Sequence, residues 1–115
     1  ERGFVTYSND AKVDLVGVPS ELINQHGAVS EAVAQSMAVG GLKSALADIV
    51  VSVTGIAGPQ GGTADKPVGM VCFGLATKRD SKALTVKFPN TGRHHIREQS
   101  VKHALKLLLE AAQAV

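Results

Sequence analysis

The alternation of hydrophobic and polar residues along the chain predicts four β-strands. Residues Gly3–Tyr7 alternate and are rich in β-prone side chains, and a continuous apolar run covers Ile49–Val53. A longer apolar run, Gly69–Thr77, is separated by a charged turn from Ala83–Phe88, which alternates cleanly. Because a short polar turn joins these last two runs, we expect them to pair as a β-hairpin.

Apolar residues at helical spacing predict two short helices followed by two long ones. They cover Asp10–Leu15, Glu21–Gln25, Ser30 to about Ala47, and about Arg93 to Ala114. Ser8 and Ser30 supply the side-chain oxygens that helix N-caps require, and Gly17 suits a helix end.

Each long helix carries one apolar stripe that we expect to be buried. The stripes are Val33, Met37, Leu42, Ala45 and Leu46 in the first, and Ile96, Val101, Ala104, Leu105, Leu108 and Ala112 in the second. Gly40 and Gly41 interrupt the first of these helices, and two glycines there cost roughly 2 kcal/mol relative to alanine. We therefore expect a neighbouring element to pack closely against them.

This order of elements predicts an α/β fold, a mixed β-sheet with helices packed on it. At 115 residues the chain suits a single domain, residues 1–115. It begins without Met, directly in an apolar stretch, so we expect that a segment upstream of Glu1 is missing.

Composition narrows the class of protein. The chain is 44% hydrophobic, 19% charged and 3% aromatic, with a formal net charge of +2. This balance suits a core of aliphatic side chains, and the lack of a basic run or an aromatic platform argues against nucleic acid as a partner. No segment has the length of a membrane span, and the single cysteine, Cys72, cannot form an internal disulfide, which fits a cytoplasmic protein.

The most informative stretch is Val53–Thr63, VTGIAGPQGGT, at the end of the second predicted strand. We call residues 55–63 the glycine loop. Its backbone N–H groups are not blocked by side chains and can hold an anion or a polarised carbonyl, and ligands often bind at strand ends in open α/β sheets. An ordinary turn explains the same composition. A P-loop does not fit, because no Gly-Lys-Ser/Thr follows the glycines.

Tyr7 and Lys12 flank the first predicted strand-to-helix turn. A lysine acts as a general base when burial or a neighbouring cation lowers its pKa, and a nearby tyrosine can relay a proton. The alternative is a half-buried strand tyrosine and a surface lysine, which is the commoner situation in proteins.

Two further residues have side chains suited to a ligand. The Thr54 hydroxyl can bond a substrate or its own backbone. Arg93 opens the last helix, where the helix N-terminus favours anions and a guanidinium can hold a phosphate through two hydrogen bonds; a solvated arginine is the alternative. His94 and His95 diverge on a helix and have no carboxylate or cysteine at ligand spacing, so we predict no metal and no cofactor.

Several segments, taken in order, resemble one family. They are FVTYSNDAK at Phe4–Lys12, GV at Gly17–Val18, HGAVSE at His26–Glu31, VTGIAGP at Val53–Pro59, KPVG at Lys66–Gly69, and Phe88-Pro89 followed by Gly92-Arg93. Together they are similar to the C-terminal domain of the CinA family, whose stand-alone members are PncC-type nicotinamide-nucleotide amidohydrolases. The similarity extends over essentially the whole chain.

The resemblance implies hydrolysis of the carboxamide of nicotinamide mononucleotide, giving nicotinic acid mononucleotide and ammonia. Tyr7 and Lys12 match the tyrosine and lysine that the family places beside a serine nucleophile. Arg93 matches an arginine near the phosphate, with Arg97 as the alternative because the preceding turn is one residue longer than usual. The residues that match the substrate-binding segment are Thr54, Gly55, Ile56, Ala57 and Gly58.

The main departure from the family concerns the nucleophile. The family's serine lies in an Ala-Glu-Ser-Cys-Thr-Gly-Gly segment that would precede Glu1, and no such segment occurs in this chain. We therefore expect an N-terminal helix–strand–helix portion to be missing and the chain alone to be inactive. A non-catalytic nucleotide-binding or regulatory domain and a purely structural dimerisation domain are the alternatives, and we expect a homo-oligomer.

Overall fold

The computed structural model describes residues 1–114, and within them the chain forms four helices and three strands. In order they are α1 (Asn9–Val16), α2 (Ser20–His26), α3 (Glu31–Ala45), β1 (Ile49–Gly55), β2 (Met70–Thr77), β3 (Ser81–Lys87) and α4 (Arg93–Gln113). Among these helices none combines the length and the apolar character that a membrane span needs.

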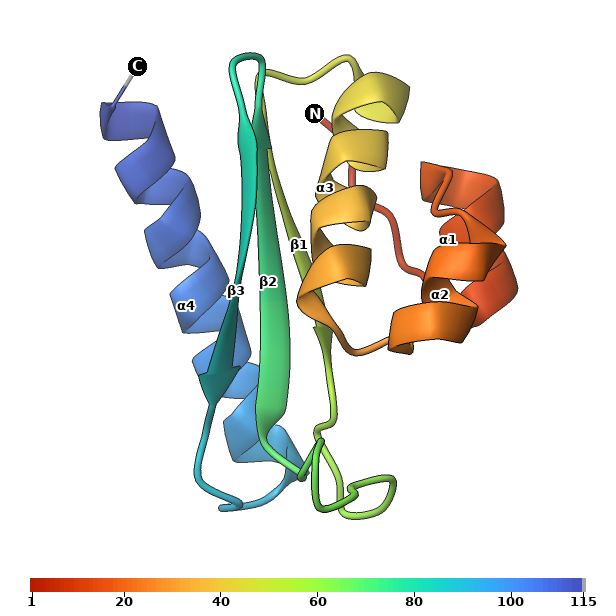
Figure 1. Cartoon of the computed structure of the whole chain (residues 1–115). Coiled ribbons are helices and arrows are strands. Elements are labelled where there is room, and N and C mark those ends of the chain that lie inside the picture. Colours follow the sequence, from red (N-terminus) through yellow and green to blue (C-terminus); the bar gives the residue numbers. More distant parts are fainter. Residues whose placement is uncertain (115) are drawn as a thin grey trace.

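The elements are arranged in layers around a small sheet. The strand order is β1-β2-β3, and both neighbouring pairs are antiparallel. Helix α3 packs on one face of the sheet and α4 on the other, while α1 and α2 lie against α3 as an outer layer (Figure 1). The predicted α/β class is therefore confirmed, and so is the hairpin, in which Met70 pairs with Lys87 and Ala76 with Ser81.

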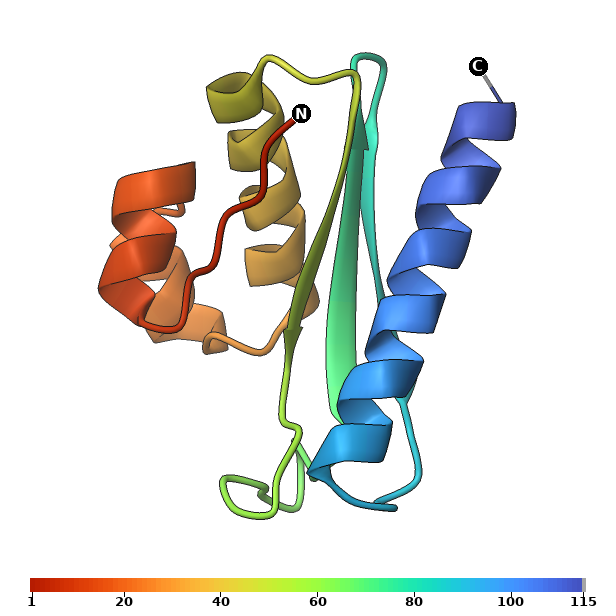
Figure 2. The same cartoon turned by 180° about the vertical axis from the view of Figure 1, so that it is seen from behind.

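The first predicted strand, residues 3–7, is not a strand in the structure. These residues run as an extended segment between α3 and β1 (Figure 2). A strand needs a hydrogen-bonding partner along its length, and a groove separates this segment from the edge of β1. Its side chains alternate in exposure: Phe4 packs against the core beneath α1 and α3, whereas Val5 is 69% exposed. Because the segment forms no ladder, every strand pair in the described residues is antiparallel.

Helix α3 begins as predicted, because the Ser30 hydroxyl accepts a hydrogen bond from the N–H of Val33 at 3.2 Å. Its predicted end is wrong by two residues. Leu46, which we expected in the buried stripe, is the C-cap in a left-handed conformation with φ 52°, and its side chain is 89% exposed. The helix closes there because Leu46 turns the chain toward β1, and this turn points its side chain away from the core.

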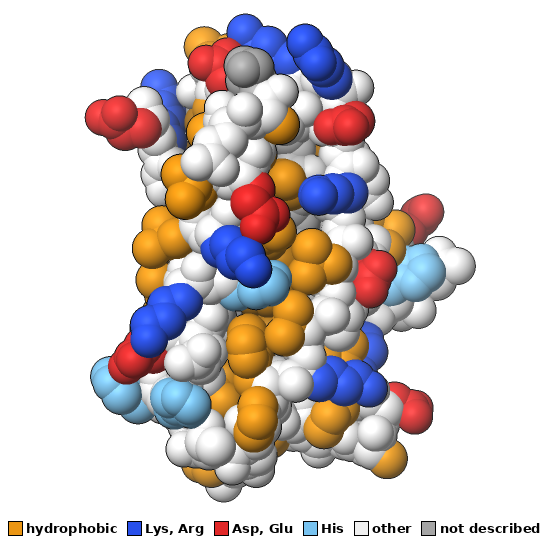
Figure 3. Space-filling model, turned by 90° about the vertical axis from the view of Figure 1, so that its left-hand side faces the viewer, with side chains coloured by type: hydrophobic (Ala, Val, Ile, Leu, Met, Phe, Trp, Pro, Cys, Tyr) orange, Lys and Arg blue, Asp and Glu red, His pale blue; other side chains and the backbone are white. Residues whose placement is uncertain are grey.

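The buried face of α4 also differs from the prediction. The buried residues are Ile96, Ser100, Ala104 and Leu107, whereas Val101 and Leu105 are 58% and 59% exposed. Apolar residues occur on more than one side of this helix, so the pattern alone does not tell which side meets the sheet. One of its flanks borders the groove at β1, and a band of hydrophobic side chains extends over the face seen in Figure 3.

A buried serine joins α3 to the sheet. The Ser52 hydroxyl on β1 donates to the Ala34 carbonyl of α3 at 2.5 Å and accepts from the Gly74 N–H of β2 at 3.1 Å. The approach is so close that a Cβ on Gly74 would lie 2.1 Å from the Ala34 oxygen. This contact fixes the spacing between α3 and β1.

We expect Ser52→Ala to lower the free energy of unfolding by about 1–3 kcal/mol, because it removes a buried hydroxyl that bonds both the Ala34 carbonyl and the Gly74 N–H. Urea denaturation of the intact protein measures the change. Ser44→Ala is the matched control, since Ser44 makes one exposed hydrogen bond, at 3.4 Å to the Leu15 carbonyl, and its loss should be close to neutral. Equal effects of the two substitutions would contradict the structural role given to Ser52.

Candidate functional site

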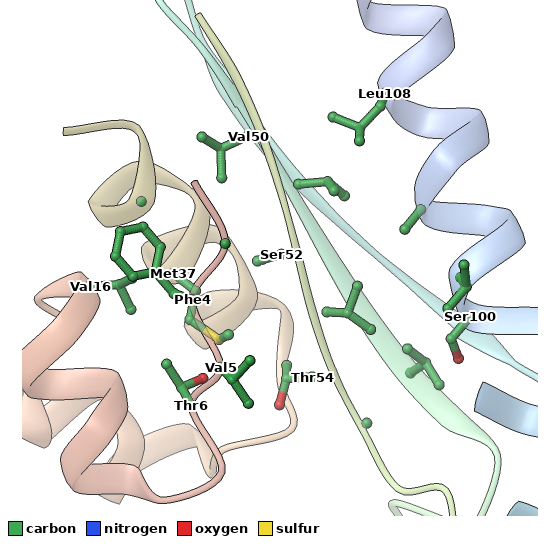
Figure 4. A pocket seen from close by; sticks show the side chains of 18 of the residues that line it. Phe4, Val5, Thr6, Val16, Met37, Val50, Ser52, Thr54, Ser100 and Leu108 are labelled. Carbon is green, nitrogen blue, oxygen red and sulfur yellow. The ribbon is translucent and has the colours of Figure 1, made fainter. Parts of the chain in front are cut away.

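A groove of about 830 Å³ follows the free edge of β1. Residues 1–7 form one wall and α4 forms the other, and the groove continues around the strand between them. Figure 4 shows Thr6 and Thr54 on the side of α3 and the N-terminal segment, with Ser100 and Leu108 on the α4 side. A ligand in this groove would therefore contact both faces of β1.

Lys12 reaches the groove from the first turns of α1. Ser8 caps this helix by accepting from the Ala11 N–H at 3.0 Å, and Gly17 ends it in a left-handed conformation, as predicted. The Lys12 residue is 6% exposed, and its ammonium donates to the Thr6 carbonyl at 2.9 Å. No carboxylate of the described residues lies within ion-pair distance of it.

Burial lowers the pKa of Lys12 below its ordinary value, because the surrounding protein replaces the water that stabilises the ammonium. An amine in this environment is neutral over a wider pH range than a surface lysine. Tyr7 also lines the groove, but it is 87% exposed and its phenol has no hydrogen bond within the described residues. Lys12 and Tyr7 therefore line the same groove, as predicted for a catalytic pair, but the amine is buried and the phenol is exposed.

The glycine loop folds back on the chain that follows it. The Ile56 N–H donates to the Met70 carbonyl at 3.0 Å, and the Gly69 N–H donates to Ile56 at 2.8 Å. Gly58 and Gly62 pack so tightly on Val68 that a Cβ on either would lie within 3 Å of it. These contacts explain why the stretch needs small residues and give the loop a defined shape.

Only part of the predicted substrate segment borders the groove. Thr54, Gly55 and Ala57 line it, whereas Ile56 and Gly58 do not. Within residues 1–114 the Ala57 N–H finds no hydrogen-bond partner, so it stays available to an acceptor in the groove.

The Thr54 hydroxyl is already engaged by the protein. It donates to the Ala28 carbonyl at 2.8 Å, and the residue is 8% exposed. Its proton is therefore used, and the oxygen can only accept a hydrogen bond from a ligand.

Two arginines approach the groove from the first turns of α4. Arg93 donates from Nη1 to the Gly58 carbonyl at 3.1 Å, which ties the helix to the glycine loop, and both Arg93 and Arg97 line the groove. Neither has a carboxylate partner among the described residues. Their charges therefore remain available for an anion on the α4 side of β1.

The histidines make local contacts. His94 lies 3.7 Å from the carboxylate of Glu98, four residues further along α4, so the expectation that no carboxylate stands at ligand spacing is wrong for His94. The His95 ring contacts the Thr91 hydroxyl. No cluster of three His, Cys, Asp or Glu side chains that could hold a metal ion exists in the part of the chain that the structure describes.

Sequence reasoning missed His103 on α4. Its ring packs against Phe73 with centroids 4.7 Å apart, and its Nε2 is buried without a partner in the described residues. The signal was available, because His103 lies three residues after Ser100 and seven after Ile96, which is the spacing of the face that meets the sheet.

Comparison with known proteins agrees with the resemblance noted from the motifs. The family described as the CinA C-terminal domain matches residues 1–112. The nicotinamide-nucleotide amidohydrolase PncC of Escherichia coli K12 is 50% identical over 108 residues, which cover 94% of this chain and 66% of that protein. The PncC of Enterobacter agglomerans is 52% identical over 110 residues, or 95% and 66% of the two chains.

A solved structure also superposes closely on this chain. The competence/damage inducible protein CihA of Agrobacterium tumefaciens superposes with a TM-score of 0.92 at 44% identity, over 95% of this chain and 67% of that one. The chain thus spans about 66% of the length of the PncC relatives that it matches.

Proposed function

We propose, because this chain belongs to the family of CinA C-terminal domains, that the protein containing it hydrolyses the carboxamide of nicotinamide mononucleotide to nicotinic acid mononucleotide and ammonia. The observation that carries the proposal is Lys12, a buried amine without a carboxylate partner among the described residues, in the same groove as the glycine loop. The relatives named as nicotinamide-nucleotide amidohydrolases support the choice of substrate.

An amide is a poor electrophile, so its hydrolysis needs an activated nucleophile, a site for the oxyanion and a proton for the leaving ammonia. Neutral Lys12 takes the proton of a serine hydroxyl as the serine oxygen bonds to the carboxamide carbon. The C–N bond then breaks, and the nitrogen leaves as ammonia with the proton that Lys12 returns. Water, deprotonated by the same amine, hydrolyses the resulting ester.

The serine of this mechanism is expected upstream of Glu1. The two serines that line the groove are unsuitable, because each already donates its hydroxyl proton to the backbone. Ser52 donates to Ala34, and Ser100 donates to the Ile96 carbonyl at 2.7 Å. Tyr7 orients the nucleophile or relays its proton.

The end of β1 and the start of α4 hold the anionic parts of the substrate. The N–H groups in Gly55–Gly58 other than that of Ile56, which is bonded to Met70, bind the ribosyl or phosphate oxygens, or the oxyanion formed at the carboxamide. Arg93 binds the phosphate, with Arg97 as the alternative, because both guanidiniums border the groove. Since Lys12 and the arginines approach from opposite faces of β1, the substrate lies across the end of this strand.

A second candidate function is a non-catalytic nucleotide-binding or regulatory domain. The engagement of both groove serines favours it, because neither Ser52 nor Ser100 has a free hydroxyl proton to give to Lys12. In either function we expect a homo-oligomer in the cytoplasm, where a free, buried thiol such as that of Cys72 stays reduced.

Ammonia release from nicotinamide mononucleotide by the intact protein separates the two functions. The amidohydrolase releases one ammonia per molecule of nicotinic acid mononucleotide formed, and a chelator leaves the rate unchanged. Binding of the nucleotide in calorimetry without ammonia release would instead assign the regulatory function. A rate that a chelator abolishes would contradict the proposed metal-independent mechanism.

A further inference from the structure

Two motifs of this chain, HGAVSE at residues 26–31 and KPVG at residues 66–69, have no part in the mechanism above. The first motif runs from the last residue of α2 to the first residue of α3, and we call its residues 26–30 the connector. The second motif follows the glycine loop. Although they are far apart in sequence, they meet at the end of the molecule where β1 leaves the sheet (Figure 1).

The connector presents three successive carbonyls, and each accepts a hydrogen bond from a side chain. Lys66 donates to His26 at 2.5 Å, Ser30 donates to Gly27 at 2.9 Å, and Thr54 donates to Ala28 at 2.8 Å. Two of the three donors therefore come from the segments that flank the glycine loop. Thr54 holds the connector where the loop begins, and Lys66 holds it just after the loop ends.

Gly27 provides the space in which Lys66 reaches the connector. A Cβ on Gly27 would lie 2.7 Å from the Lys66 Nζ, and the residue has φ 81°, a conformation that side chains other than glycine rarely adopt. Gly27 also ends α2, with its N–H bonded to the Ile23 carbonyl at 2.7 Å. The ammonium thus lies against the carboxyl end of a helix, where a cation is favoured.

Lys66 is also tied to the glycine loop itself. Its N–H donates to the Thr63 hydroxyl at 3.0 Å, and its carbonyl accepts from the Thr63 N–H at 2.9 Å. The last residue of the loop is therefore bonded in both directions to the residue whose side chain holds the connector. A displacement of Lys66 therefore acts directly on Thr63, the loop residue to which it is hydrogen-bonded.

We propose that Lys66, seated over Gly27, is a positioning residue that holds the glycine loop in its binding conformation. The inference rests on the proposed function, because it assumes that the loop contacts the substrate. Removal of the ammonium releases one of the two bonds that fix the loop to the connector. Free N–H groups on a mobile loop bind an anion less tightly, so substrate binding weakens while the proton transfer at Lys12 continues.

The test compares Lys66→Met, Lys66→Arg and Gly27→Ala in the intact protein, with Lys82→Met as the control because Lys82 is exposed on β3. For Lys66→Met we expect KM for nicotinamide mononucleotide to rise about tenfold, the factor given by loss of one charge-assisted hydrogen bond, with kcat little changed. Lys66→Arg should restore part of the affinity, since a guanidinium can also donate to the His26 carbonyl. Lys82→Met should behave as the wild type.

Hydrogen exchange of the amides in residues 56–66 gives a readout that does not depend on catalysis. We expect faster exchange in both Lys66→Met and Gly27→Ala. In the double variant Lys66→Met/Gly27→Ala the two effects on loop exchange should not add, because both substitutions break the same contact between Lys66 and the connector. Unchanged exchange, or fully additive effects, would overturn the inference.

The two proposals fail in different ways. If exchange accelerates but KM stays the same, Lys66 does not position a binding loop, and the inference is wrong. If the wild-type protein releases no ammonia, the proposed function fails. The inference is then tested by calorimetry, with the dissociation constant of the nucleotide in place of KM. A dissociation constant that is unchanged in Lys66→Met would overturn the inference.

Discussion

Lys12→Met should lower kcat/KM for deamidation of nicotinamide mononucleotide by about 10²–10⁴-fold, the usual contribution of a general base. The thioether side chain fills a similar volume but cannot accept the serine proton. Lys12→Arg should be equally impaired, because the guanidinium remains charged at every accessible pH. Initial rates of ammonia release by the intact variants measure both changes. Near-normal turnover by Lys12→Arg would mean that the site needs a positive charge there and no base.

The same variants test the direction of the Lys12 pKa. Because burial lowers this pKa, the fraction of neutral amine grows as pH rises, so wild-type kcat/KM should increase with pH and level off above the pKa. That rising limb should be missing from the residual activity of Lys12→Met. Lys43→Met is the control, since Lys43 is exposed on α3, and its pH profile should match the wild type.

Loss of activity in Lys12→Met should not come from unfolding. A lysine whose pKa is lower in the folded state than in the unfolded state disfavours folding below the folded-state pKa, and this cost disappears as pH rises toward the unfolded value. At neutral pH the variant should therefore be at least as stable as the wild type in thermal denaturation. A marked loss of stability would show instead that the bond to the Thr6 carbonyl dominates at this position.

Gly40→Ala should be among the most damaging conservative changes in the chain, lowering the free energy of unfolding by about 3 kcal/mol or more. A Cβ at this position of α3 would lie 1.6 Å from the Val16 carbonyl oxygen, so the backbones of α1 and α3 must move apart. Since Lys12 lies on α1, activity should fall together with stability. Denaturant unfolding of the intact protein measures the first effect and ammonia release the second.

Gly41→Ala is the matched control for this prediction. It occupies the next position in the same helix, and its Cβ would meet only the tip of the Val50 side chain, at 3.1 Å. Both substitutions gain about 1 kcal/mol of helix propensity, so the difference between them isolates the backbone clash. If the two variants unfold at the same denaturant concentration, α1 and α3 do not pack as closely as described.

The sequence predicted the elements well where local chemistry decides them. Ser8 and Ser30 cap their helices, Gly17 ends α1, and alternating side chains pair β2 with β3. The close packing at Gly40 was also predictable. Two glycines in a helix interior lower helix stability relative to alanine, and a close contact with a neighbouring element offsets that loss. The caps, the helix end and the hairpin depend on a few neighbouring residues, whereas the sequence did not tell which element packs on Gly40.

Features that depend on distant partners were not predictable in the same way. Residues 3–7 have the composition of a strand, but strand formation requires a neighbouring edge, which they lack in the structure. Apolar residues lie on more than one side of α4, so the pattern alone did not tell which side meets the sheet, and Val101 was assigned to the wrong face. The bond between Lys66 and the His26 carbonyl joins residues 40 positions apart, so no local pattern announces it.

In the candidate site the residues were predictable from the sequence, but their surroundings were not. Lys12, Tyr7, Thr54 and Arg93 were singled out from their motifs, and all four line one groove. Their environments were not predictable, since the engagement of the Thr54 hydroxyl depends on Ala28. The roles of these residues stay predictions.

A crystal structure of the intact protein with nicotinamide mononucleotide bound would show whether Lys12, the glycine loop and the first turn of α4 serve one binding site. We expect one nucleotide across the end of β1, with its carboxamide on the Lys12 side and its remaining polar groups against the glycine loop and the first turn of α4. A nucleotide bound outside this groove, or one whose carboxamide lies on the α4 face away from Lys12, would contradict this expectation.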